Sequence, residues 1–327
     1  MIKYYYGGKI GMEIFLEKAF NGECIRIRYG EKTKTNIIID SGTGIFAKTF
    51  KKLIDKIIQN NEVIDLLILT HIDDDHINGF RRSISNINGK YIKKIWLNGE
   101  PIQYYNNQTH SPKNIGGLVE TIRTKGINLI TPILGGTMER IGEADLTVLT
   151  PRYEDMINVS RKIERLTPHG ECNKYSLSFD ELSIIDEYKP DNSNTNKASI
   201  SFIFSYEYKN IAFLGDAHAE DIIYGLSRYW NGKPIDIVKL SHHGSKYNVN
   251  DKLLSMLGSH KFIISKKSAV HKETIGRLLS YGESVEIYCN YKWWTSVRFF
   301  TVQDKSKYLD TNKLKMFVIG QDGIVIE

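Results

Sequence analysis

The chain has 327 residues, of which 41% are hydrophobic and 25% are charged, and its formal net charge is +6. These proportions are close to those of globular proteins and exclude a collagen-like or disordered chain. No apolar stretch approaches the roughly 20 residues that cross a bilayer, and residues 1–8 lack the apolar core of a signal peptide. The cysteines are three in number and far apart, so a disulfide framework is not expected. We therefore expect a cytoplasmic protein with no membrane association.

The first part of the chain predicts hairpin strands followed by a helix. Short apolar segments over residues 12–40 indicate the strands, and the last one ends in Asp40-Ser41-Gly42. After this turn, five apolar residues recur at helical spacing and would lie on one face of a helix. They are Phe46, Phe50, Leu53, Ile54 and Ile57. Further strands are predicted at residues 92–97 and 146–149, where Thr150-Pro151 acts as a breaker.

A group of metal-ligand residue types follows the apolar run at residues 64–70. Residues 71–76 read His-Ile-Asp-Asp-Asp-His, so His71, Asp73, Asp75 and His76 lie where a buried strand ends. Mixed imidazole and carboxylate ligands suit zinc, manganese or iron. The alternative is a solvated acidic turn that merely ends the strand.

Residues 152–195 are polar and lead into a turn-rich stretch, Asp-Asn-Ser-Asn-Thr-Asn, at residues 191–196. We interpret residues 152–195 as an insertion or mobile segment beside the active site. A more specific hypothesis is that this segment is a lid that closes over the substrate. Residues 199–214 then alternate like a half-buried hairpin.

Two later strands also end in chemically active residues. The strand at 211–214 ends in Gly215-Asp216, and a helix is predicted over residues 218–230. The strand at 235–241 ends in the sequence His-His-Gly-Ser at residues 242–245. Either motif alone could be structural. Three such strand ends in this order predict a shared site, because open α/β sheets place their chemistry at strand ends.

These motifs resemble those of the metallo-β-lactamase superfamily. The closest resemblance is to the hydrolase domain of ComEC-type DNA-uptake proteins and their stand-alone relatives, which carry H-x-D-x-D-H, G-D-A and H-H-G-S. The resemblance extends from residue 12 to beyond residue 271 and implies an α/β fold, an αββα sandwich of two mixed β-sheets flanked by helices. Residues 1–327 would form one domain, with the insertion at 152–195. Strands of the second half are predicted at residues 262–265, 285–289, 297–302 and 315–319.

The resemblance also implies a site for two divalent metal ions, zinc or manganese. His71 and Asp73 would hold one ion, the other would be held by Asp75, His76 and His243, and Asp216 would bridge both. Most members of the superfamily add a third histidine to the first ion from the middle of the chain. The histidines between residues 76 and 216 are His110 and His169, and neither follows an obvious strand.

Several other residues are candidates with open roles. Since successive residues of a strand point to opposite sides, we expect His243 to be the ligand and His242 to contact phosphate or donate a proton; the reverse assignment stays open. Asp40 would orient a ligand or cap the Ser41-Gly42 turn. His271 is either on the substrate side or a plain helix start.

Cationic residues give weaker indications of a substrate. Lys266 and Lys267 are expected at the rim of the metal site, where they would contact phosphate. His218 is expected to be exposed on its helix. Residues 291–294 and 298–300 combine aromatic and cationic side chains, which would stack on nucleic-acid bases or form an interior strand pair or partner interface.

The predicted function is a metal-dependent phosphodiesterase or nuclease in which a hydroxide held by two metals attacks phosphorus. Asp75 would also orient or deprotonate this water. Nucleic acid or another phosphodiester would be the substrate. The alternatives are a metallohydrolase of a small phosphoester, lactam, thioester or peptide, or a non-enzymatic protein that retains the fold. An effector controlled by a protein partner is also compatible, but the sequence names no partner.

Overall fold

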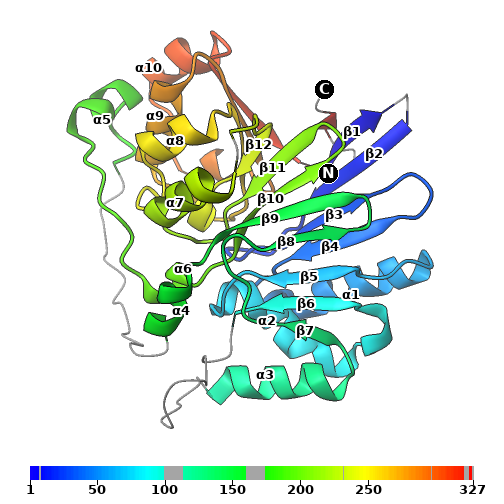
Figure 1. Ribbon diagram of the computed structural model, residues 1–327. Coiled ribbons are helices and arrows are strands. Elements are labelled where there is room, and N and C mark those ends of the chain that lie inside the picture. Colours follow the sequence, from blue (N-terminus) through cyan, green and yellow to red (C-terminus); the bar gives the residue numbers. More distant parts are fainter. Residues whose placement is uncertain are drawn as a thin grey trace.

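Two β-sheets lie face to face with helices on their outer sides in the computed structural model (Figure 1). This confirms the predicted αββα sandwich of two mixed sheets. In the part of the chain that the structure describes, no helix is long and apolar enough to cross a membrane. The structure describes residues 1–6, 9–98, 113–159, 174–230, 232–295, 297–319 and 324–325.

The first sheet has the strand order β16-β1-β2-β3-β4-β5-β6-β7. Its hairpin strands β1 to β4 are antiparallel, whereas β4 to β7 run parallel. The strands are β1 (Ile2–Tyr6), β2 (Lys9–Leu16), β3 (Ile25–Tyr29), β4 (Thr35–Ile39), β5 (Leu66–Leu69), β6 (Lys94–Leu97), β7 (Asn128–Ile130) and β16 (Ile324–Val325).

The second sheet has the order β15-β14-β13-β12-β11-β10-β9-β8. Here β8 to β11 are antiparallel and β11 to β15 are parallel. The strands are β8 (Met138–Ile141), β9 (Ala144–Thr150), β10 (Ser201–Tyr206), β11 (Lys209–Phe213), β12 (Ile237–Lys239), β13 (Lys261–Ile264), β14 (Val285–Cys289) and β15 (Leu314–Val318).

The helices cover the outer faces because each buries one apolar stripe. Residues of α1 (Ala47–Gln59), α2 (Asp74–Ser83) and α3 (Lys113–Thr124) share a buried cluster with the outer face of the first sheet. Those of α7 (Ala219–Tyr229), α8 (Asp251–Leu257) and α9 (Lys272–Tyr281) do the same on the second sheet. Shorter helices are α4 (Tyr153–Val159), α5 (Phe179–Ile185), α6 (Asn194–Lys197) and α10 (Val302–Asp304).

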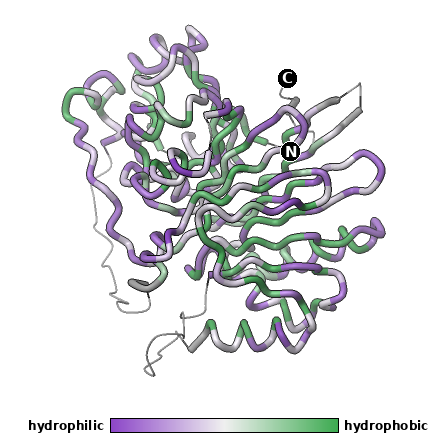
Figure 2. Tube along the Cα trace, in the orientation of Figure 1, coloured by the Kyte–Doolittle hydropathy of each residue, from purple (hydrophilic) through white to green (hydrophobic). Residues whose placement is uncertain are grey.

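The main core lies between the sheets, where apolar residues from both sheets interdigitate. Trp96 of the first sheet meets the ring of Phe202 of the second sheet edge-on at 6.5 Å, and Tyr29 meets Phe204 in the same way at 5.2 Å. The apolar colouring follows these central strands, while the loops are hydrophilic (Figure 2). This packing fixes the two sheets relative to each other and thereby the strand ends that carry the site.

The structure corrects one local prediction and defines the helix after the first motif. Residues 297–302 do not form a strand; they turn into α10, where Thr301 and Asp304 form a capping box and the buried Asp304 accepts a hydrogen bond from Lys272. The helix after the first motif begins at Asp74, so Asp75 and His76 belong to its first turn. Residues 152–195 contain α4 and α5 in their described parts. That this segment is an insertion into one domain stays a prediction.

Candidate metal centre

The three predicted motifs meet at one edge of the sandwich. The first follows β5 of the first sheet, and the other two follow β11 and β12, which are parallel neighbours in the second sheet. A hydrogen bond of 2.8 Å from the backbone N–H of Ile200 to the carbonyl of Thr70 connects the two sheets at this edge. Residues far apart in sequence therefore face one another across the sandwich.

The start of α2 is fixed by the turn after β4. The backbone N–H and the hydroxyl of Ser41 both donate to the carbonyl of His76, at 2.7 and 2.8 Å. Gly79 lets the helix approach this closely, since a Cβ there would lie 1.7 Å from the carbonyl oxygen of Ser41. The turn thus determines the direction in which Asp75 and His76 point.

Buried hydrogen bonds fix the orientation of His71 and His76. The carboxylate of Asp40 accepts hydrogen bonds of 2.8 Å from the backbone and hydroxyl of Thr70, and His76 Nδ1 lies 2.8 Å from the same carboxylate. Because the Thr70 hydroxyl donates to Asp40, it accepts from His71 Nδ1 at 3.0 Å. Both histidines therefore carry hydrogen on Nδ1 and present Nε2 to the site. The orienting role considered for Asp40 is the one that this geometry favours.

His243 has the same arrangement, since its Nδ1 lies 2.8 Å from the carbonyl oxygen of Ser265. The Nε2 atoms of His71, His76 and His243 and one carboxylate oxygen of Asp216 are buried and have no hydrogen-bond partner within the described part of the chain. Buried polar atoms are normally paired. A group of unpaired lone pairs that face one another is what a cation would satisfy, so these residues fit a metal centre.

Two overlapping sets have ligand atoms within 4.8 Å of one another: His71, His76 and Asp216 form one, and Asp75, His76 and His243 form the other. Nε2 of His76 lies 3.4 Å from Asp216 Oδ2, and Nε2 of His243 lies 3.5 Å from Asp75 Oδ2. Ligands about 2.1 Å from a tetrahedral zinc ion are separated by about 3.4 Å. The separations therefore fit pairs of ligands on one ion.

Asp73 lies at the open side of the first set. Its carboxylate is 3.6 Å from Nε2 of His71, accepts a hydrogen bond of 3.3 Å from the hydroxyl of Thr195, and is 40% exposed. Among the described residues, Asp73 thus lies beside His71 but belongs to neither of the two sets. His110 and His169, considered for a third histidine ligand, lie outside the described residues.

The electrostatic environment suits cation binding. Burial opposes the charged form of Asp216, but its neighbours, chiefly His76, hold the pKa of this carboxyl well below its usual range. Burial also lowers the pKa of His243 to about 4, so this imidazole is neutral near pH 7. For His76, the carboxylates of Asp216 and Asp40 outweigh burial and raise the pKa. A metal must displace this proton, so metal binding weakens as the pH falls.

The backbone at His242 and His243 contradicts the alternation expected of a strand end. Both residues are left-handed, with φ of 46° and 53°, inside a short 3₁₀ turn. Both imidazoles therefore turn towards the site. Nε2 of His242 lies 3.8 Å from Asp216 Oδ2, but the His242 side chain is 39% exposed, whereas that of His243 is 3% exposed. His242 thus lies at the rim and His243 lies within the buried group.

Asp191 is a site residue that the sequence did not indicate, because it lies in a polar loop with no motif. It accepts hydrogen bonds from the backbone of Ser193 at 2.9 Å and from the side-chain amides of Asn196 and Asn248 at 2.7 and 3.1 Å. Its carboxylate lies 3.4 Å from Nδ1 of His242. Together with Asp216, Asp191 raises the pKa of His242 against the effect of burial.

His218 was expected to be exposed, and this expectation is wrong. The residue caps the N-terminus of α7, is only 4% exposed, and has its Nε2 3.8 Å from the Asp191 carboxylate. From this position before α7, the His218 side chain reaches the loop that holds Asp191.

The remaining candidates lie at different distances from the centre. Burial lowers the pKa of Lys266, while the charges of Asp216 and Asp75 act in the opposite direction. Lys267 instead is exposed and lies over the ring of Phe20. His271 caps α9 and accepts a hydrogen bond of 3.4 Å from the backbone of Lys246.

The aromatic and cationic residues near the C-terminus are largely internal. Trp293 is 1% exposed and Phe299 is fully buried, with their rings 5.1 Å apart in the core outside the second sheet. The interior alternative is therefore correct for these two rings, although they do not belong to a strand.

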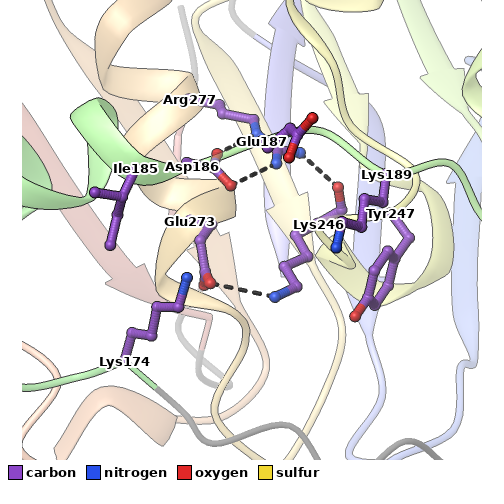
Figure 3. A pocket seen from close by; sticks show the side chains of 9 residues that line it. All are labelled: Lys174, Ile185, Asp186, Glu187, Lys189, Lys246, Tyr247, Glu273 and Arg277. Carbon is purple, nitrogen blue, oxygen red and sulfur yellow. Dashed lines mark hydrogen bonds and ion pairs between the residues drawn. The ribbon is translucent and has the colours of Figure 1, made fainter.

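A pocket of about 320 Å³ adjoins the loop that follows His243 (Figure 3). Within it, Lys246 pairs with Glu273 at 3.2 Å, and Arg277 pairs with Asp186 at 2.6 Å. The backbone N–H of Asp191 donates to the carbonyl of Tyr247 at 3.0 Å. The lining of the pocket therefore contacts the loop whose Asp191 carboxylate lies beside His242. The pocket is lined by Lys174, Ile185, Asp186, Glu187, Lys189, Lys246, Tyr247, Glu273 and Arg277.

Residues 19–92 match the family model of the metallo-beta-lactamase superfamily. The matched segment includes the Asp40 turn and the motif at residues 71–76. No curated relative matches the chain.

Similar solved structures share little sequence with this chain. The metallo-beta-lactamase fold protein YhfI from Bacillus subtilis is 10% identical with a TM-score of 0.47, and 85% of this chain and 96% of that chain are covered. A diphosphatase from the PhnP family is 9% identical with a TM-score of 0.40, over 91% of this chain and 82% of that chain. An isothiocyanate hydrolase from Delia radicum gut bacteria is 10% identical with a TM-score of 0.39, over 93% of this chain and 95% of that chain. These likenesses are too distant to indicate an activity.

Removal of the shared carboxylate should empty the centre. Asp216→Ala removes the negative charge that would offset the repulsion between two metal ions beside His71 and His76. We therefore expect the content of both metals to fall. The measurement is elemental analysis after dialysis against buffer without metal. Asp145→Ala, which removes a carboxylate that is 63% exposed and lies on β9, is the matched control. Full metal content in Asp216→Ala would refute its bridging position.

Proposed function

We propose that the protein is a metal-dependent hydrolase and that its substrate is a phosphodiester. The observation that supports this most directly is the set of three buried Nε2 atoms, each of which is turned to the same centre by an acceptor on Nδ1. The resemblance of the three motifs to those of ComEC-type hydrolase domains supports the phosphodiester and, more narrowly, a nuclease.

The ligands would divide between two positions. His71 and Asp73 would serve the first, Asp75, His76 and His243 the second, and Asp216 both. Two bound divalent ions would supply a water of lowered pKa and stabilise the charge that grows on the phosphoryl oxygens. Manganese and zinc both suit this set of imidazoles and carboxylates.

Asp75 would orient the attacking water and accept its proton. Its carboxylate is 41% exposed, so one oxygen can face the second metal position while the other reaches the open side. Asp73 has a comparable exposure, but its hydrogen bond to Thr195 leaves it less free to accept a proton.

His242 would protonate the leaving oxygen. Its position at the rim allows contact with substrate, and the carboxylates on either side raise the pKa of the imidazole, which favours the protonated form near neutral pH. Asp191 would hold the ring by its Nδ1, as a carboxylate orients a histidine acid or base in other hydrolases.

Lysines near the centre would bind the phosphates of a substrate. Lys266 follows the strand β13 and feels the charges of Asp216 and Asp75, and Lys174, Lys189 and Lys246 line the adjoining pocket (Figure 3). The net charge of +6 also favours a polyanion. The pocket also contains the carboxylates of Asp186, Glu187 and Glu273.

The proposed activity is tested by a substrate screen with the metal-depleted protein and with protein loaded with Mn²⁺ or Zn²⁺. We expect the loaded protein to cleave bis(p-nitrophenyl) phosphate and DNA or RNA oligonucleotides, and the depleted protein to be inactive. Asp216→Ala is the negative control. Cleavage of a lactam, thioester or phosphomonoester without cleavage of any phosphodiester would contradict the proposal and favour the alternative hydrolase.

A variant of His242 tests the division of roles between the two adjacent histidines. If His242 is the proton donor, His242→Ala should keep both metals and slow phosphodiester cleavage by roughly 10²–10⁴-fold. His243→Ala should lose metal instead, because His243 belongs to the buried group. Loss of a metal in His242→Ala would show that His242 is a ligand of the first metal position.

A further inference from the structure

A fully buried ion pair lies next to the segments that carry Asp216 and His243. Lys239, the last residue of β12, has no exposed surface, and Glu23, just before β3, is 1% exposed. Their side chains form an ion pair. Burial of two charges requires strong compensation.

The lysine of this pair contacts the strand end that carries Asp216. The Lys239 ammonium donates to the carbonyl of Gly215 at 3.2 Å, and the backbone N–H of His242 donates to the same oxygen at 3.0 Å. Gly215 has a φ of 51°, and a Cβ there would lie 2.4 Å from the hydroxyl oxygen of Ser199. Lys239 thus stabilises the junction between the Asp216 segment and the His242 segment.

The glutamate contacts the other two segments. Its carboxylate lies 3.6 Å from Nδ1 of His243, and its backbone N–H donates to the carbonyl of Asp75 at 3.2 Å. The neighbouring Gly22 allows this approach, because a Cβ there would lie 2.2 Å from the Asp75 carbonyl oxygen. Glu23 therefore connects the start of α2 to the turn that holds His243.

We propose that Glu23 and Lys239 are positioning residues that hold the segments of Asp75, Asp216 and His243 in register for metal binding. The inference rests on the metal centre but not on the identity of the substrate. Neither side chain touches the reacting atoms. Lys239 acts through the carbonyl oxygen of Gly215, and Glu23 acts through its ion pair with Lys239 and its charge beside His243, as residues behind metal ligands commonly determine affinity.

The test is a titration of metal-depleted protein with Mn²⁺ alone, followed by calorimetry. We expect Glu23→Gln and Lys239→Met to weaken the binding of at least one ion by about 10–100-fold. In the double variant E23Q/K239M, no buried charge is left unpaired, so its thermal stability should recover above that of Lys239→Met. The metal affinity should stay low, because the contact with Gly215 is still missing.

Lys272→Met is the matched control. It breaks another fully buried ion pair, that between Lys272 and Asp304, which contacts none of the candidate metal ligands. It should lower stability and leave Mn²⁺ affinity unchanged. If Lys239→Met does not fold, Glu23→Gln carries the test.

Wild-type Mn²⁺ affinity in folded Glu23→Gln and in the double variant would overturn the inference, as would an equal loss of affinity in Lys272→Met. A wild-type protein that binds no Mn²⁺ would overturn it together with the metal centre. Wild-type protein that binds Mn²⁺ but cleaves no phosphodiester would contradict only the proposed function.

Discussion

The structure depends on an unusual concentration of buried polar atoms without partners at one edge of the sandwich. In the described part of the chain, three imidazole nitrogens and a carboxylate oxygen face a common centre, and the Nδ1 atom of each imidazole is already engaged on the other side of its ring. In a folded protein, such an arrangement is unfavourable unless a cation satisfies the lone pairs. The fold, the hydrogen bonds of Asp40 and the Glu23–Lys239 pair all serve to maintain it.

The sandwich supplies this arrangement through its topology. The ends of β5, β11 and β12 come from two sheets that the central aromatic core holds together. Gly79 of α2 lets the helix approach the turn at Ser41 after β4, and Gly215 after β11 approaches the side chain of Ser199. Since the ligands sit at the ends of buried strands, their positions follow from the core rather than from mobile loops. His242 and Asp191, in contrast, lie at the rim, where a substrate can reach them.

The sequence could predict the parts of the site that are encoded locally. The three motifs at strand ends, through the resemblance that they carry, predicted the candidate ligands and the two-sheet fold, and the apolar runs predicted individual strands, because motifs and runs are both short-range patterns. It could not predict the left-handed turn at His242 and His243, since strand alternation was the only local guide. Asp191, Glu23 and Lys239 were missed for a related reason. Their contacts join segments distant in sequence, and each would pass for an ordinary surface charge or strand residue.

The account is tested most directly by anomalous diffraction from crystals of the protein grown with Mn²⁺. We predict two peaks roughly 3.5–4 Å apart, with Asp216 between them, Asp73 and His71 on one side, and Asp75 and His243 on the other. A single peak that Asp216 does not touch, or no peak beside the Nε2 atoms of His71, His76 and His243, would contradict it.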